Sequence, residues 1–103
     1  MDIFTVYDSK SGVYMRPFFA RSKGEAIRSF TTEVNSGSDT SLVAQYPADF
    51  TLFHLGSFDD EKASFDLLPT PVSLGVALEF AAASVNNLQR WGRGDKIPLP
   101  FWF

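Results

Sequence analysis

The apolar and polar pattern of residues 1–20 predicts a β-hairpin. Residues 3–7 (Ile-Phe-Thr-Val-Tyr) are β-branched and aromatic, residues 8–12 (Asp-Ser-Lys-Ser-Gly) favour a turn, and a second apolar run spans residues 13–20. Because Pro17 has no N–H to donate to a ladder, we expect the second strand to be an edge strand or to carry a bulge at that point.

A helix is predicted after the hairpin. Ser22 and Glu25 have capping-box spacing, in which the serine hydroxyl accepts the Glu25 N–H and the glutamate carboxylate accepts the Ser22 N–H. The apolar residues that follow form one stripe: Ala26, Ile27, Phe30 and Val34. Asn-Ser-Gly at 35–37 ends the pattern, so the stripe is expected to face a sheet.

Two more strands complete the predicted core. Residues 36–42 are expected to be a loop, and residues 50–55 form a strand too apolar for clean alternation, which indicates a central position. Residues 59–62 are a turn leading to a strand at 64–68. We therefore predict an α+β fold with a ββαββ core, in which one helix packs on a mainly antiparallel four-stranded sheet.

The prolines at 69 and 71 are expected to end this core and to begin a linker. We thus predict a core domain at 1–71 and, at 72–103, a helix from Ser73 to about Gly92 followed by an aromatic tail. An exposed aromatic tail is a liability in water, so the helix and tail should dock on the core or on a partner subunit. The predicted interface residues are Leu78, Val85, Leu88, Trp91, Phe101, Trp102 and Phe103.

Composition excludes several classes of protein. A chain of 103 residues is the size of one domain, and without cysteine it has neither a disulfide framework nor a thiolate zinc site. No apolar run approaches the roughly 20 residues of a spanning helix, and no secretory signal is recognisable, so we expect a cytosolic protein without membrane contact.

Catalytic and metal chemistry also lack support in the sequence. His54 is the only imidazole and stands alone in an apolar strand, where a hydrogen-bonded structural role is expected. Acidic residues 59–61 lack the glycine and ligand spacing of a calcium loop. We expect no catalytic residue, no metal and no cofactor, and an enzyme built on Asp66 or Glu79 is the weakest alternative.

Charge limits where a nucleic acid can bind. The net charge is −3, with five basic and five acidic residues in 1–48, one basic and six acidic in 49–80, and three basic and one acidic in 81–103. A DNA-binding surface must therefore come from the first or the last segment. The overall balance argues against tight nonspecific binding.

Basic and aromatic residues do alternate around the second strand and the helix. The candidate single-strand-binding residues are Tyr14, Arg16, Phe18, Arg21, Lys23 and Arg28. Rings stack bases and cations track phosphates in such proteins, and strand alternation places Tyr14, Arg16 and Phe18 on one face. The alternative is that Tyr14 and Phe18 belong to the core and that the cations form an ordinary solvated surface.

Several long strings resemble a known family. They are residues 6–10 (VYDSK), 17–19 (PFF), 23–30 (KGEAIRSF), 49–60 (DFTLFHLGSFDD) and 65–75 (FDLLPTPVSLG). They are similar to the small nonstructural protein of gokushovirus-type microviruses, which are single-stranded-DNA phages. The resemblance implies an early protein of the bacterial host cytoplasm, commonly labelled DNA-binding, with a role in genome replication or packaging and without catalytic residues.

Two hypotheses follow. The first is a noncatalytic accessory factor of phage replication or packaging that contacts single-stranded DNA weakly. The second is a protein-interaction module that forms a homo-oligomer, or docks on a phage replication or capsid protein, through the second helix and the tail.

Overall fold

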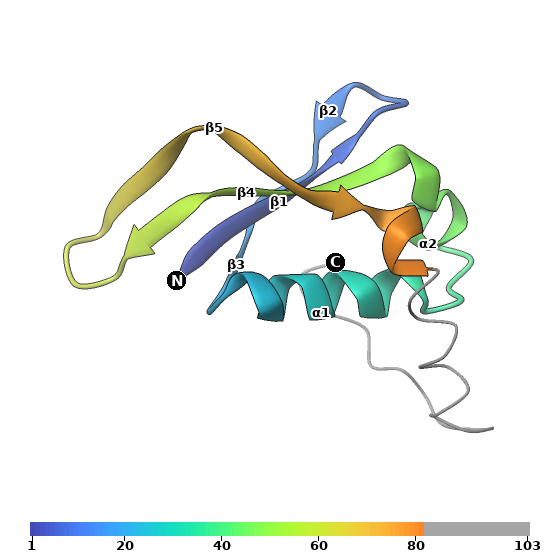
Figure 1. The fold of residues 1–103 in the computed structure, drawn as a ribbon, viewed down its shortest axis with the longest axis horizontal. Coiled ribbons are helices and arrows are strands. Elements are labelled where there is room, and N and C mark those ends of the chain that lie inside the picture. Colours follow the sequence, from blue (N-terminus) through green and yellow to red (C-terminus); the bar gives the residue numbers. More distant parts are fainter. Residues whose placement is uncertain (82–103) are drawn as a thin grey trace.

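The computed structural model describes residues 1–81 (Figure 1). The chain order of its elements is β1 (Asp2–Asp8), β2 (Val13–Tyr14), β3 (Phe18–Ala20), α1 (Lys23–Val34), α2 (Leu42–Gln45), a 3-10 turn (Pro47–Asp49), β4 (Phe50–Asp59) and β5 (Ser64–Val76). Residues 77–81 are helical. The predicted α+β class is confirmed.

The strands form one antiparallel sheet in the order β2-β1-β4-β5, and β3 also pairs with β1. The sheet therefore has five strands, where the sequence predicted four. The expected second strand is divided into β2 and β3 because Pro17 cannot donate to the ladder. Between these two strands, the Met15 N–H donates to the Val6 carbonyl and keeps the link bonded to β1. The central position expected for β4 is confirmed.

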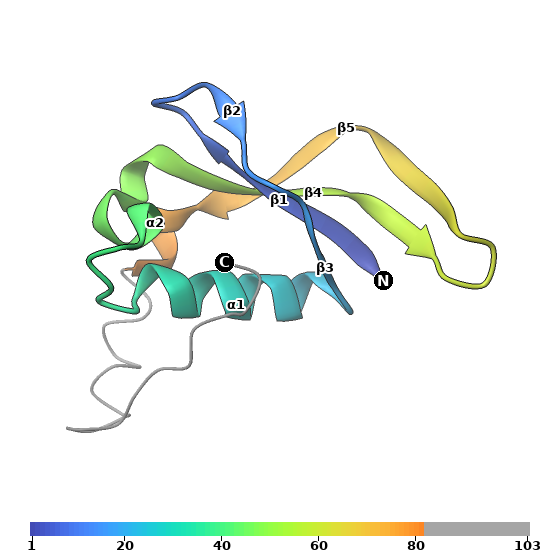
Figure 2. The same cartoon turned by 180° about the vertical axis from the view of Figure 1, so that it is seen from behind.

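Helix α1 covers one face of the sheet, whereas β2 and the bend of β5 rise on the other side (Figures 1 and 2). Its predicted start is confirmed, since Ser22 Oγ accepts the Glu25 N–H at 3.1 Å. The Glu25 carboxylate accepts the N–H of Arg21, at 3.1 Å, rather than that of Ser22. Between α1 and the sheet lies the core cluster of Phe4, Val6, Phe18, Ala20, Ala26, Phe30, Val34, Val43, Phe50, Leu52 and Ala77.

Strand β5 contradicts the predicted linker. It continues through both prolines to Val76, so the predicted boundary at 71/72 falls inside a strand and the predicted helix start at Ser73 is wrong. The prolines fit for two reasons. First, β5 is an edge strand, where a missing N–H costs no ladder bond. Second, both prolines lie in a bulge, because residues 68–71 stand opposite Leu55 alone, between the pairs Gly56↔Leu67 and His54↔Val72. The surplus residues form a raised arch. The predicted helix and tail beyond residue 81 lie outside the described residues.

A short helix was also not expected. Helix α2 begins within the predicted loop, and the Ser41 hydroxyl caps it by accepting the Ala44 N–H at 3.2 Å. Its one buried residue, Val43, joins the core cluster. A helix of four residues is too short to show a helical period, which explains why the sequence pattern did not predict it.

Candidate nucleic-acid interface

The sheet face opposite α1 carries aromatic rings that no described element covers. Strand register pairs Tyr7 of β1 with Tyr14 of β2, and their ring centroids are 4.7 Å apart. Phe53 of β4 lies 5.7 Å from Tyr14 and 6.5 Å from Tyr7. We call Tyr7, Tyr14 and Phe53 the open-face cluster. Tyr14 is 50% exposed, so a planar ligand can reach its ring.

A second group of rings lies toward the β4–β5 turn. Phe58 contacts both Phe19, at 6.0 Å between centroids, and Phe65, at 5.1 Å. We call Phe19, Phe58 and Phe65 the hairpin cluster. Phe19 is 48% exposed and Phe65 is 62% exposed. Exposed rings thus stand at both ends of this face.

A small apolar pocket separates the two clusters. It has a volume of about 250 Å³ and is lined by Thr5, Tyr14, Met15, Pro17, Leu55 and Pro71. The arch of β5 supplies Pro71, and the link between β2 and β3 supplies Met15 and Pro17. The Thr5 hydroxyl donates to the Met15 carbonyl at 2.6 Å and holds this link against β1. The open face is therefore hollowed rather than flat.

The structure separates the predicted DNA-binding residues of the second strand. Tyr14 and Arg16 are exposed, but Phe18 is only 5% exposed and stacks on Phe4 at 5.7 Å. The prediction that Phe18 shares the exposed face is wrong. Because the strand breaks at Pro17, alternation restarts at β3, and Phe18 pairs in register with Phe4 on the face that α1 covers.

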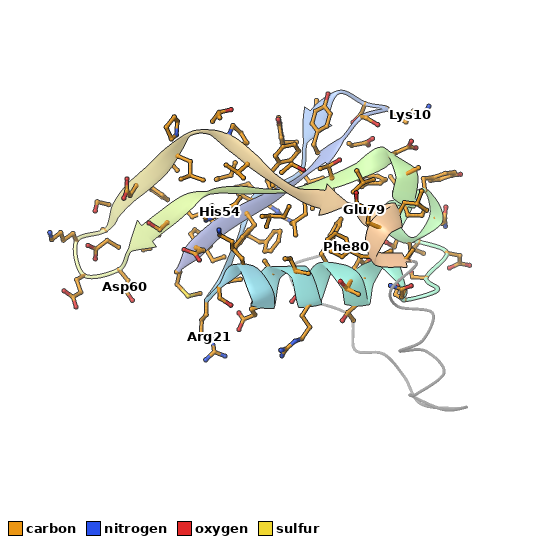
Figure 3. All side chains as sticks on the ribbon, viewed as in Figure 1. Lys10, Arg21, His54, Asp60, Glu79 and Phe80 are labelled. Carbon is orange, nitrogen blue, oxygen red and sulfur yellow. The ribbon has the colours of Figure 1, made fainter. Side chains whose placement is uncertain are left out.

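The other predicted cations lie on a different layer of the molecule. Arg21, Lys23 and Arg28 are exposed at the start of α1 and along it. Arg21 lies by α1, whereas Lys10 is at the tip of the β1–β2 turn, across the sheet (Figure 3). Arg21 also pairs with Glu25, with Nε and Oε2 3.3 Å apart. The six predicted residues do not form one surface.

Sequence reasoning missed Tyr7 and Phe53 of the open-face cluster and the whole hairpin cluster. Phe53 lies within a run that seemed too apolar to alternate, and its position on the open face follows from the pair Thr5↔Phe53. The position of Phe19 on the same face follows from the pair Ile3↔Phe19. Both signals are strand registers, which connect residues far apart in the sequence.

Other polar side chains have structural roles. His54 Nε2 lies 3.0 Å from the Gly56 carbonyl, and its ring stacks on Phe4 at 5.0 Å, which confirms the expected hydrogen-bonded histidine. Asp59 Oδ1 accepts the N–H groups of Glu61 and Lys62 in the β4–β5 turn. Among residues 1–81, no three His, Asp or Glu side chains gather as metal ligands would.

Of the predicted protein-interface residues, only Leu78 is described, and it is 54% exposed. Val85, Leu88, Trp91, Phe101, Trp102 and Phe103 lie outside the described residues. In the described part of the chain, no helix has the length and apolar character needed to span a bilayer.

Comparison with known proteins agrees with the sequence resemblance. Residues 1–80 match the family described as Phage ORF5 protein. The chain is 31% identical over 78 residues to Protein ORF5 of Chlamydia phage 1, which covers 74% of this chain and 77% of that protein. No solved structure matches the chain. The predicted likeness to a small phage protein is confirmed, and the chain belongs to the Phage ORF5 protein family.

Proposed function

We propose that this phage protein is a noncatalytic accessory factor that contacts single-stranded DNA through the open face of its sheet. One observation carries the proposal: the open-face cluster of Tyr7, Tyr14 and Phe53 lies on the sheet face opposite α1, with the Tyr14 ring half exposed. Proteins that read unpaired bases commonly stack them on aromatic side chains of an open sheet.

Cations near this cluster supply the contacts to phosphate. Arg16 follows Tyr14 by two residues, and Lys10 lies at the tip of the turn that leads into β2; both are exposed. The net charge of −3 favours weak contact dominated by stacking over tight binding to any polyanion. The proposed surface therefore keeps Tyr14 and Arg16 of the sequence prediction. It leaves out Phe18, Arg21, Lys23 and Arg28 and adds Tyr7, Phe53 and Lys10.

The proposed setting is genome replication or packaging of the phage in the host cytoplasm. Family membership supports a phage accessory role. The histidine and the turn carboxylates described above are engaged in local structure, which supports a role without catalysis.

The test is fluorescence anisotropy of a labelled single-stranded oligonucleotide at several salt concentrations. Wild-type binding should weaken with salt, and replacing Arg16 and Lys10 by alanine should reduce the log–log salt slope by about 0.7 for each lost phosphate contact. Arg21→Ala is the matched control, because it removes a cation from the other layer. If Arg21→Ala lowers the slope and the double variant does not, the open face is not the binding surface.

A second candidate function is self-association through the hairpin cluster. Phe65 and Leu67 are each 62% exposed on edge strand β5, which has no pairing partner on its outer side among residues 1–81. Exposed apolar side chains on a free edge favour pairing with another chain. A second copy is the proposed partner; docking on a phage replication or capsid protein through Leu78 and the C-terminal segment is the alternative.

Light scattering coupled to size exclusion tests this candidate. The wild-type protein should have the mass of an oligomer, and Leu67→Lys should give a monomer. Leu42→Lys is the control, since Leu42 is also exposed, at 58%, but lies on α2. A monomeric wild-type protein contradicts self-association.

A further inference from the structure

A larger cavity lies beside the open face. It has a volume of about 440 Å³ and lies between the β1–β2 turn, the C-terminal part of α1 and the segment that leads into α2. This volume falls in the range of roughly 300–1,000 Å³ that is typical of small-molecule pockets. Val13, Met15, Leu42, Val43 and Phe50 supply apolar walls. The cavity can therefore hold a planar ring system.

Glu33 distinguishes this cavity from the other hollows. The residue lies on α1, is 3% exposed and lines the cavity. Its Oε1 atom is closed to water and has no hydrogen-bond partner, and no other buried side-chain nitrogen or oxygen in the described part of the chain is in that position. An unpaired buried acceptor is costly, and a charged one more so, which indicates that a donor belongs beside it.

Two other polar groups of the cavity lining accept local hydrogen bonds. Asp8 Oδ1 accepts the N–H groups of Lys10 and Ser11, at 3.0 and 3.4 Å. Ser41 Oγ accepts the Ala44 N–H at 3.2 Å. These groups hold the turn and the α2 cap in place. Glu33 Oε1, by contrast, accepts no hydrogen bond, so a ligand in the cavity that carries a donor can satisfy it.

The cavity lies next to the apolar pocket of the open face. Tyr14 lines both this cavity and the apolar pocket of the open face. An adjoining cavity of about 340 Å³ shares Asp8, Leu42 and Phe50 with it and adds Lys10, Tyr46 and Asp49. A strand stacked on the open face can turn one base past Tyr14, with Lys10 near its phosphate.

We propose that the cavity binds one unstacked guanine of single-stranded DNA, whose Watson–Crick edge donates to the Glu33 carboxylate. This inference rests on the proposed function and names the base that the site selects. An ionised carboxylate only accepts hydrogen bonds. Guanine presents two adjacent donors, N1–H and the 2-amino group, whereas each other base places an acceptor next to its donor. The Glu33 carboxyl must rotate about its last side-chain bond, a torsion with a broad energy well.

The first test uses an oligothymidylate with one central guanine and the same strand with hypoxanthine, which keeps N1–H but lacks the 2-amino group. The guanine strand should bind about tenfold more tightly. Glu33→Gln should abolish this preference while leaving the salt slope unchanged. Glu61→Gln makes the same change of charge at the exposed β4–β5 turn and should keep the preference. Equal binding of the two strands by the wild-type protein overturns the proposal and leaves the open-face function standing.

The second test needs neither a folded variant nor DNA binding. Free deoxyguanosine should cause saturable amide shifts at Glu33 and at Ser38–Val43 in NMR spectra, and deoxyinosine should cause weaker ones. If no oligonucleotide binds but deoxyguanosine does, the open-face function and single-stranded DNA as the source of the base are both wrong, whereas guanine recognition by the cavity is supported. A response to guanidinium ion without one to deoxyguanosine overturns the proposal, because it indicates an arginine of a protein partner as the ligand.

Discussion

The two faces of the sheet carry similar side chains but differ in how far those side chains are buried. On the face toward α1, Phe4, Val6 and Leu52 are at most 1% exposed. On the opposite face, Tyr14 and Phe19 keep about half of their surface, at 50% and 48%. Because alternate residues of a strand point to opposite faces, a helix that covers one face leaves the rings on the other free for a ligand. The covered face supplies stability, and the open face is the proposed binding surface.

The largest expected effect tests the covered face. Phe30 is 0% exposed, and its ring lies 5.7 Å from that of Phe80. Phe30→Ala should lower the free energy of unfolding by about 3–5 kcal/mol, because it removes buried contacts and leaves a cavity. Tyr14→Ala on the open face should cost less than about 1 kcal/mol. Urea unfolding measures the free energy of unfolding of both variants. Equal decreases would contradict the claim that only the covered face stabilises the fold.

Gly56 tests how the arch of β5 is held over β4. A Cβ at this position would lie 2.4 Å from the Asp66 carbonyl oxygen, and φ is +154°. Gly56→Ala should therefore destabilise the fold by about 3 kcal/mol. Gly12→Ala is the control, since Gly12 also has a positive φ, +74°, but nothing within 4 Å, and should cost about 1 kcal/mol. Similar thermal stabilities of the two variants would show that the close approach of β5 is unimportant.

The third prediction separates binding from stability. Tyr14→Ala and Phe53→Ala should each weaken single-stranded-DNA binding by about 1–3 kcal/mol through lost stacking, and Tyr14→Ala should change the free energy of unfolding little. Phe18→Leu should lower the free energy of unfolding and leave DNA binding unchanged, because Phe18 is in the core. Anisotropy titrations of the folded variants decide the matter. If Phe18→Leu weakened binding more than Tyr14→Ala and Phe53→Ala do, Phe18 would belong to the DNA-binding surface after all.

The smallest effect concerns the cap of the covering helix. Ser22→Ala removes the acceptor for the Glu25 N–H and should cost about 1 kcal/mol. Ser29→Ala, within the same helix, should be neutral or slightly stabilising because alanine has the higher helix propensity. Chemical denaturation should show this difference, and its absence would mean that α1 starts without help from its cap.

Local patterns predicted the elements that depend on neighbours in sequence. The turn after β1, the Ser22 cap and the apolar stripe of α1 all followed from spacing. The open-face position of Phe53 and the buried one of Phe18 did not, because each depends on a strand register set by tertiary pairing. Glu33 carried no signal either, since a carboxylate on a helix is ordinarily solvated and only the packing of α1 buries it.

The most direct test of the account is an NMR titration of the full-length, isotope-labelled protein with a short single-stranded oligonucleotide. Shifts should concentrate on the open face, at Tyr7, Tyr14 and Phe53, and spare the exposed side of α1. Shifts centred on Lys23 and Arg28, or none at saturating DNA, would contradict the claim that the uncovered face of the sheet binds single-stranded DNA.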